Sequence, residues 1–143
     1  MSSLTDRQVR TVIDAIVTAI RARDVDALMK HYAPNAVAFD LQAPMQHRGS
    51  VAIKKRATEW FASYEGPLGY EMRDLSIVAD EEVAFCHSLN GIKGKLKDGA
   101  KVEMWWRATN GFRRVNGEWA ITHAHNSEPF DVASGKALLE LKE

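Results

Sequence analysis

The stretch WWRATNGFRRVNGEWAITHAHNSEP, residues 105–129, decides the fold that the sequence predicts. At its centre, the dipeptide Asn116-Gly117 separates two runs that are rich in aromatic and β-branched residues. This dipeptide favours a type I′ turn, because both central residues of that turn have positive φ, which Asn and Gly adopt most easily. The stretch is therefore predicted to form a tight β-hairpin that turns at these two residues.

The turn also predicts which side chains share a face of the hairpin. A two-residue turn sets the register, so Val115 pairs with Glu118 and the other pairs count outward from there. One face then carries bulky apolar side chains, those of Trp106, Phe112, Trp119 and Ile121. The opposite face is expected to form the wall of a pocket, and its small or polar side chains include Arg107, Thr109, Ala124 and Asn126. A bulge near Gly111 would exchange the two faces beyond it.

Length and composition predict one domain over residues 1–143. The 19 basic and 19 acidic side chains cancel without forming a basic cluster, so neither nucleic acid nor a membrane is an expected partner. Cys86 is the only cysteine, which excludes an intrachain disulfide and is typical of a reducing compartment. The first ten residues lack the apolar segment of a signal peptide. We therefore expect a cytoplasmic protein.

The residues before the hairpin predict helices first and strands afterwards. A helix is expected over residues 5–20, where Thr5 and Gln8 have the spacing of a capping box. A short helix capped by Asp24 follows, then a strand over residues 36–41 and a third helix over residues 50–64. Residues 70–79 and 83–92 are predicted strands that lead into the hairpin. This order indicates an α+β domain whose curved, mainly antiparallel sheet wraps around the helices.

Three motifs in this framework resemble a known superfamily. They are YAPNAVAFD (residues 32–40), the W-x-R-x-T run at residues 105–109, and WAITHAHNS (residues 119–127). The chain is similar to the nuclear-transport-factor-2-like (NTF2-like) superfamily, and within it to the SnoaL-like and ketosteroid-isomerase-like branch. The resemblance implies a cone-like fold, with the N-terminal helices on the concave side of a strongly curved sheet, and it implies a homodimer. It does not imply one chemistry, because this fold carries several kinds of enzyme as well as binding modules.

Asp40 is the candidate catalytic residue. The resemblance implies this role, because Asp40 falls where ketosteroid isomerases carry their general-base aspartate, and a carboxylate there could accept a proton from a carbon next to a carbonyl group. The oxyanion donors of those enzymes are not matched: Ile16 replaces the first-helix tyrosine, and no acid occurs at the second position. The alternative interpretation is a polar residue that caps the loop after its strand.

Arg107 is the candidate anchor of the pocket. It either binds a carboxylate or enolate of the ligand, or forms a buried pair with an acid such as Glu103 or Asp40. The other candidate ligand-pocket residues are Thr109, Asn126, Trp60, Tyr64 and His87. Trp60 and Tyr64 also fit the hydrophobic core.

His123 and His125 lie two residues apart on a strand and therefore project from the same face. They are interpreted as a structural pair at a subunit interface, as a proton shuttle, or as metal ligands with His87 as the third. No recognised ligand spacing occurs, so neither a metal nor another cofactor is expected.

Two functions stay open at this point. The first is acid–base chemistry, of the isomerase, cyclase or dehydratase type, on a small hydrophobic carbonyl compound. The second is a non-catalytic module that binds a small hydrophobic or anionic ligand or that oligomerises, because the HAHNS run (residues 123–127) is also similar to the association domain of calmodulin-dependent kinase. In either case we expect a homodimer that covers the bulky face of the hairpin with a second subunit.

Overall fold

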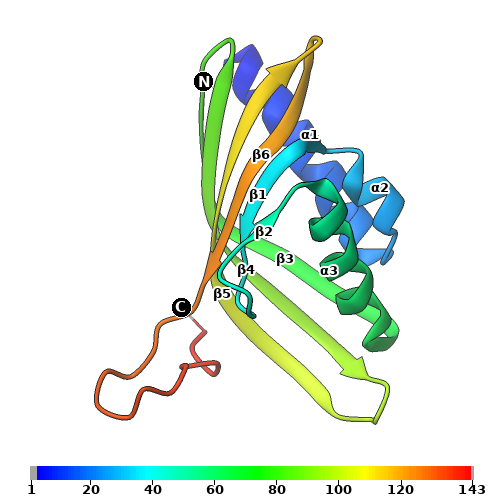
Figure 1. Cartoon of the computed structure of the whole chain (residues 1–143), viewed down its shortest axis with the longest axis vertical. Coiled ribbons are helices and arrows are strands. Elements are labelled where there is room, and N and C mark those ends of the chain that lie inside the picture. The colour runs from blue at the N-terminus through cyan, green and yellow to red at the C-terminus, as the bar shows by residue number, and fades with distance from the viewer. Residues whose placement is uncertain (1–2, 143) are drawn as a thin grey trace.

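The computed structural model describes residues 3–142 as three helices and one sheet of six strands (Figure 1). The helices are α1 (Leu4–Arg21), α2 (Val25–Met29) and α3 (Ser50–Ala62). The strands are β1 (Tyr32–Phe39), β2 (His47–Arg48), β3 (Tyr64–Ala79), β4 (Val83–Leu96), β5 (Lys101–Val115) and β6 (Glu118–Ser127). The sheet order is β2-β1-β6-β5-β4-β3.

The helices cover one face of a strongly bent sheet (Figure 1), which we call the inner face; the opposite face is the outer face. Neighbouring strands are antiparallel except for β1 and β6, which are parallel. α1 packs mainly against β3, and α3 packs mainly against β1. The predicted α+β architecture is confirmed. No helix among residues 3–142 is long and apolar enough to cross a lipid bilayer.

The hairpin of β5 and β6 turns where the sequence predicts. Asn116 and Gly117 have φ values of 52° and 81°, as a type I′ turn requires. The predicted register holds from Val115↔Glu118 to Phe112↔Ile121, but the next pair is Gly111↔His123. Thr122 is thus the extra residue of a β-bulge, which exchanges the faces of β6 beyond it.

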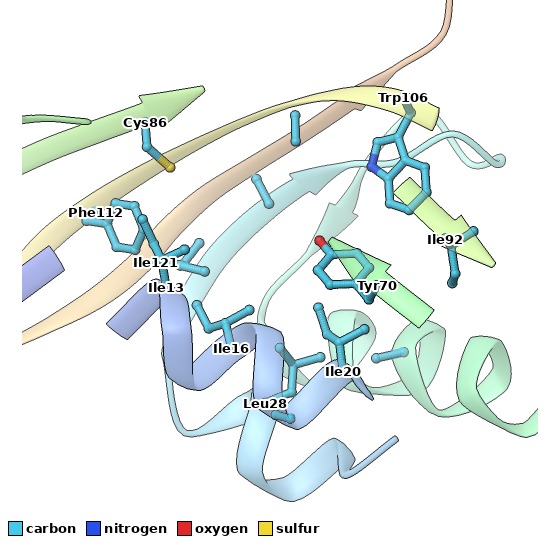
Figure 2. Packing of buried hydrophobic residues seen from close by; sticks show 14 of the residues in the cluster. Ile13, Ile16, Ile20, Leu28, Tyr70, Cys86, Ile92, Trp106, Phe112 and Ile121 are labelled. Carbon is cyan, nitrogen blue, oxygen red and sulfur yellow. The ribbon is translucent and has the colours of Figure 1, made fainter. Parts of the chain in front are cut away.

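The bulky face of the hairpin is the inner face, so the prediction that a second subunit covers it is wrong. Trp106, Phe112, Trp119 and Ile121 are all buried within the single chain. They belong to one cluster with the apolar stripe of α1, formed by Val9, Ile13, Ile16 and Ile20 (Figure 2). The physical reason is that this stripe needs a large apolar surface, which the small-residue face does not offer.

The N-terminus of α1 is capped two residues earlier than predicted. Ser3, not Thr5, is the N-cap, and its hydroxyl accepts a hydrogen bond from the backbone N–H of Asp6 at 3.1 Å. Gln8, the other half of the predicted capping box, instead accepts hydrogen bonds from Arg114 at 3.0 Å and from Trp119 at 3.3 Å. The polar side chain therefore ties the helix to the hairpin.

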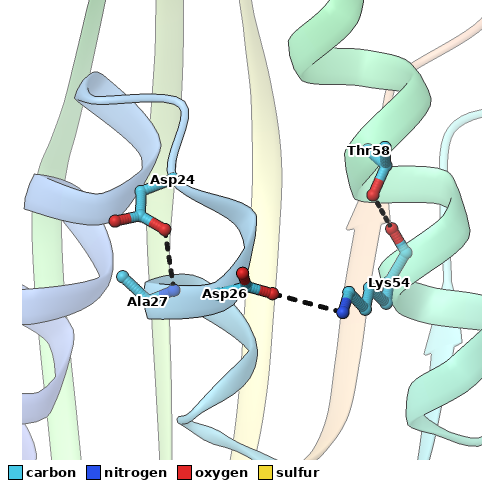
Figure 3. Close-up of polar contacts among 5 residues, drawn as sticks. All are labelled: Asp24, Asp26, Ala27, Lys54 and Thr58. Carbon is cyan, nitrogen blue, oxygen red and sulfur yellow. Dashed lines mark hydrogen bonds and ion pairs between the residues drawn. The ribbon is translucent and has the colours of Figure 1, made fainter.

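The second helix is capped as predicted, and it is joined to the third. Asp24 accepts a hydrogen bond from the backbone N–H of Ala27 at 3.0 Å (Figure 3). Lys54 of α3 lies 3.2 Å from the carboxylate of Asp26. Both side chains of this ion pair are largely exposed, so it contributes little to stability. It does link α2 to α3, which pack against each other.

Replacing Phe112 with Ala should lower the free energy of unfolding by about 3–5 kcal/mol, because the side chain is only 2% exposed and its removal leaves a cavity under α1. Urea denaturation followed by circular dichroism measures this change. Val115→Ala is the control on the same strand, because Val115 is 45% exposed, and it should cost less than about 1 kcal/mol. Equal losses for the two variants would contradict the described packing.

Candidate functional site

The site is built on the inner face by two neighbouring rows of cross-strand residues. In the first row, Asn126 of β6 pairs with Ala108 of β5, which pairs with Ser88 of β4. In the second row, Trp106 of β5 pairs with Asn90 of β4. Ala108 is buried and has only a methyl side chain. It is therefore a small side chain with polar groups on either side and an indole next to it.

Asp40 directly follows β1 and lies at one end of the first row. Its Oδ2 is 3.0 Å from Nε of Arg56, which comes from α3, and both side chains are 20% exposed. Its Oδ1 accepts a hydrogen bond from the backbone N–H of Leu41 at 2.8 Å and a longer one from Nδ2 of Asn126 at 3.4 Å. The carboxylate is thus held on the inner face, where the arginine compensates its charge.

Tyr70 of β3 stands at the other end of the site. Its hydroxyl oxygen accepts a hydrogen bond from Nδ2 of Asn90 at 2.9 Å, and Oδ1 of Asn90 accepts one from the hydroxyl of Ser88 at 2.7 Å. All three residues are buried. A buried chain of this kind is rigid because each group fixes the orientation of the next.

The tyrosine hydroxyls of the site stay protonated near neutral pH. Burial raises the pKa of Tyr32 to about 12, and the negative charge of Asp40 adds to this shift. Burial also raises the pKa of Tyr70, and Tyr32 contributes to that increase. Asp40 thus acts on the pKa of Tyr32, and Tyr32 acts on the pKa of Tyr70. Tyr32 and Tyr70 can therefore donate hydrogen bonds, but neither can serve as a phenolate base.

Trp60 and Tyr64, two of the predicted pocket residues, have different positions in the structure. The ring of Trp60 lies 6.4 Å from that of Trp106 and 6.3 Å from that of Tyr64. Tyr64 begins β3 rather than ending α3, and its carbonyl oxygen accepts a hydrogen bond from Arg23 at 2.6 Å. Of the predicted pocket residues, Trp60 thus lies beside the site, Asn126 lies in it, and Tyr64 is a core residue.

The predicted positions of Arg107, Thr109 and His87 in the pocket are wrong. All three are exposed on the outer face, because they alternate with the inner-face residues of β4 and β5. Arg107 donates a hydrogen bond to the hydroxyl of Ser127 at 3.0 Å and pairs with neither Glu103 nor Asp40.

The two histidines of β6 also lie on the outer face. The ring of Phe39 is 4.7 Å from that of His123 and 5.3 Å from that of His125. Nδ1 of His123 is 2.8 Å from the carbonyl oxygen of Val37, within hydrogen-bonding distance. Within residues 3–142, no group of three or more His, Cys, Asp or Glu side chains is arranged to hold a metal ion.

Sequence reasoning missed Arg56, Tyr70 and the two polar residues of β4, although signals for some of them exist. Arg56 lies between Ile53 and Trp60 at helical spacing, which places it on the side of α3 that packs inward. Ser88 and Asn90 lie at every second position between Cys86 and Ile92, so the four residues share one face of β4, and both Cys86 and Ile92 are buried. Only the pairing of distant segments, which a single sequence does not show, reveals that Tyr70 meets Asn90.

The fold and the polar groups on its inner face define a protein of the NTF2-like class. The chain belongs to the SnoaL-like domain family, whose sequence profile matches residues 9–131. No functionally curated protein sequence matches the chain.

Solved structures of several bacterial proteins share this fold. An NTF2-like protein of unknown function from Pseudomonas putida is 32% identical over 100% of this chain and 99% of that chain, with a TM-score of 0.90. A protein from Streptomyces avermitilis, provisionally assigned as a dehydratase, is 17% identical over 87% of this chain and 96% of that chain, with a TM-score of 0.76. A ketosteroid isomerase-like protein from Erwinia carotovora is 16% identical over 90% of this chain and 100% of that chain, with a TM-score of 0.74.

None of the three tyrosines should ionise near the ordinary pKa of 10.0 while the protein is folded, because burial raises the pKa of Tyr32, Tyr64 and Tyr70. The folded state holds these protons more tightly than the unfolded state. Their contribution to stability is therefore intact below pH 10 and is lost as the pH rises through the folded-state values. Ultraviolet absorbance of phenolate, recorded during alkaline titration of native and urea-unfolded protein, measures the difference. A native phenolate signal that is half developed at pH 10 would contradict the burial.

Proposed function

We propose that the protein catalyses proton transfer next to the carbonyl group of a small, largely apolar compound, with Asp40 as the base. The observation that carries this proposal is the carboxylate itself, which Arg56, Asn126 and the backbone N–H of Leu41 hold on the inner face. The core side chains on the same inner face are apolar or aromatic, as in Ala108 and Trp60. A fixed carboxylate beside an apolar surface suits a substrate whose acidic hydrogen is on carbon.

Isomerisation, cyclisation and dehydration can share this first step. The C–H bond next to the carbonyl breaks, its proton goes to the Asp40 carboxylate, and its electron pair forms the C=C bond of an enolate. In an isomerisation or a dehydration, the protonated Asp40 then returns the proton to another carbon or to a leaving hydroxyl group. In a cyclisation, the enolate carbon forms a bond to a second carbonyl carbon of the same compound, and Asp40 returns the proton to the alkoxide oxygen that results. The structural similarity to a provisionally assigned dehydratase and to a ketosteroid isomerase-like protein extends to the fold, and it is compatible with either outcome.

Asp40→Asn should abolish proton exchange at the methyl group of acetophenone, a simple ketone probe whose methyl hydrogens are acidic. Proton NMR in D₂O follows the loss of the methyl signal with wild-type protein and with the variant. The amide keeps the shape of the carboxylate but does not accept the proton. Arg107→Met is the matched control, because Arg107 lies on the outer face, and it should exchange at the wild-type rate.

Two outcomes would contradict the proposal. One is an Asp40→Asn variant that exchanges as fast as the wild-type protein. The other is a wild-type protein that adds nothing to the rate of exchange in buffer alone. Circular dichroism of each variant shows whether the fold is retained.

A second candidate function is self-association without catalysis, and the outer face favours it. Phe39, Val78 and Phe85 are large apolar side chains that remain exposed on this face of the single chain. Phe39 contacts His123 and His125, which belong to the run that is similar to a kinase association domain. Val78 and Phe85 continue the same row across β3 and β4, because Phe85 pairs with Gly111 and Gly111 pairs with His123. We propose that this outer patch, rather than the bulky face of the hairpin, is the surface at which a second copy of the chain binds. A dimer would be compatible with either function.

Phe85→Glu should convert the dimer into a monomer without unfolding it, because it places a charge at the centre of the outer patch. Trp119→Glu should instead prevent folding, because Trp119 is buried under α1. Sedimentation velocity gives the mass, and circular dichroism gives the folded fraction. A wild-type protein that sediments as a monomer at micromolar concentration would overturn the dimer.

A further inference from the structure

The geometry points to a two-donor oxygen site: the hydroxyl of Tyr70 and the indole N–H of Trp106 together bind the carbonyl oxygen of the ligand. The site is neutral and apolar in its surroundings, so it selects a ketone or aldehyde oxygen over a carboxylate or a phosphate. The inference rests on the proposed function only in the step in which Asp40 accepts a proton; the binding of the oxygen does not depend on it.

Trp106 supplies a buried donor that has no acceptor. Its side chain is 7% exposed, and no described residue accepts a hydrogen bond from its Nε1. The buried indole of Trp119 differs, because it donates to Gln8 at 3.3 Å. Leaving a buried N–H unpaired costs about 1–3 kcal/mol, so such groups are rare in native proteins. The unpaired N–H of Trp106 is therefore explained best by an acceptor that a ligand provides.

Tyr70 supplies a second donor whose direction is fixed. Asn90 donates to the hydroxyl oxygen, and Ser88 in turn orients Asn90 by donating to its amide oxygen. With one lone pair of the hydroxyl occupied in this way, the proton of Tyr70 points elsewhere. No described residue accepts this proton. Asn90 and Ser88 are thus positioning residues for the hydroxyl.

The two donors belong to neighbouring aromatic rings. The rings of Tyr70 and Trp106 are 6.2 Å apart, with an angle of 42° between their planes. Figure 2 shows the hydroxyl oxygen of Tyr70 and the indole nitrogen of Trp106 turned into the interior between β5 and α1. Ala108 is the next inner-face residue of β5 after Trp106, so the side chain beside the indole is a methyl group. Apolar side chains such as Ile20 and Ile92 complete the surroundings.

The chemistry of the donors indicates the kind of oxygen. Tyr70 stays protonated and the indole carries no charge, so neither group compensates a full ionic charge as a guanidinium would. A carbonyl oxygen needs only such neutral donors. When a proton leaves the adjacent carbon, the electron pair of the carbonyl moves onto this oxygen, and donors already in place stabilise the charge that develops there.

The position of Asp40 fits this orientation of the ligand. Asp40 and Asn126 lie on the β6 side of Ala108, whereas Ser88 and Asn90 lie on its β4 side. A ligand whose oxygen is bound by Tyr70 and Trp106 would extend across Ala108 toward the Asp40 end of the row. The unmatched oxyanion donors of the ketosteroid isomerases are thereby replaced by groups from β3 and β5.

Acetophenone and ethylbenzene test the site, because they have nearly the same shape and only the first has an oxygen. In protein labelled with ¹⁵N, the four tryptophans give four indole signals, and the signal of Trp106 is the one that Trp106→Phe removes. Acetophenone should move this signal downfield, and ethylbenzene should move it much less. The Trp119 signal is the internal control and should move with neither compound, because its N–H is already paired.

Tyr70→Phe gives the matched measurement of affinity. It should weaken the binding of acetophenone by roughly 2- to 10-fold and leave the binding of ethylbenzene unchanged, as expected for the loss of one hydrogen bond. Trp106→Phe should have the same selective effect, so the inference can be tested even if one variant fails to fold. Titrations followed by fluorescence or NMR give both dissociation constants.

Three results would overturn the site: equal movement of the Trp106 signal with both compounds, no binding of acetophenone up to its solubility limit, or equal loss of affinity for both compounds in the variants. Failure of the proposed function is distinguishable from these results. If acetophenone moves the Trp106 signal selectively but exchanges no protons, the oxygen site stands and catalysis by Asp40 fails. If exchange depends on Asp40 while Tyr70→Phe binds both compounds as the wild-type protein does, the oxygen site fails and the catalytic proposal stands.

Discussion

The contact between α1 and the bulky face of the hairpin is the constraint on which the rest of the structure depends. The stripe that contains Val9 and Ile13 is buried against a surface that includes Phe112 and Ile121. Burying one large aliphatic or aromatic side chain contributes roughly 1.5–3 kcal/mol, so covering the bulky face of the hairpin with α1 stabilises the protein more than covering its small-residue face would. It determines which face of β5 points inward, and the residue alternation of every neighbouring strand follows from that choice.

The bulge at Thr122 then changes which side chains of the last part of β6 point inward. In an unbroken register, His123 and His125 would point inward with Trp119. The extra residue instead turns both histidines to the outer face and brings Ala124 and Asn126 inside. Asn126 can therefore reach Asp40, and the inserted residue is what joins the end of β6 to the site.

Much of the fold follows from the sequence, because its signals are local. The turn at Asn116-Gly117, the register next to it and the cap at Asp24 all depend on residues close together in the chain. The faces of the sheet could not be assigned in this way, because they depend on which surface α1 covers. The wrong positions of Arg107 and Thr109 both result from that one choice.

Asn126 shows how two errors can cancel. A regular register places Asn126 on the same face as Arg107, which is the outer face in the structure. The bulge reverses the faces of β6 beyond Thr122, so Asn126 points to the inner face after all. The assignment of Asp40 comes from the family resemblance and does not depend on the register of the hairpin, and in the structure Asp40 follows Ala36 and Ala38 on the inner side of β1. Its partner Arg56 comes from another element, so the ion pair required the tertiary structure.

The polar groups of the inner face are not explained by stability. Replacing a buried ion pair with apolar side chains of similar volume is often neutral or stabilising, so the presence of the pair of Asp40 and Arg56 is not itself a sign of a stabilising role. Cys86, in the same core, is different, because burial raises the pKa of its thiol to about 11 and leaves it neutral and inert. The chain thus combines an apolar core that accounts for folding with a small set of oriented polar groups that folding does not require. Those groups separate into a carboxylate paired with an arginine at Asp40 and a neutral donor end at Tyr70 and Trp106, which together provide the base and the oxygen site that the proposed proton transfer would use.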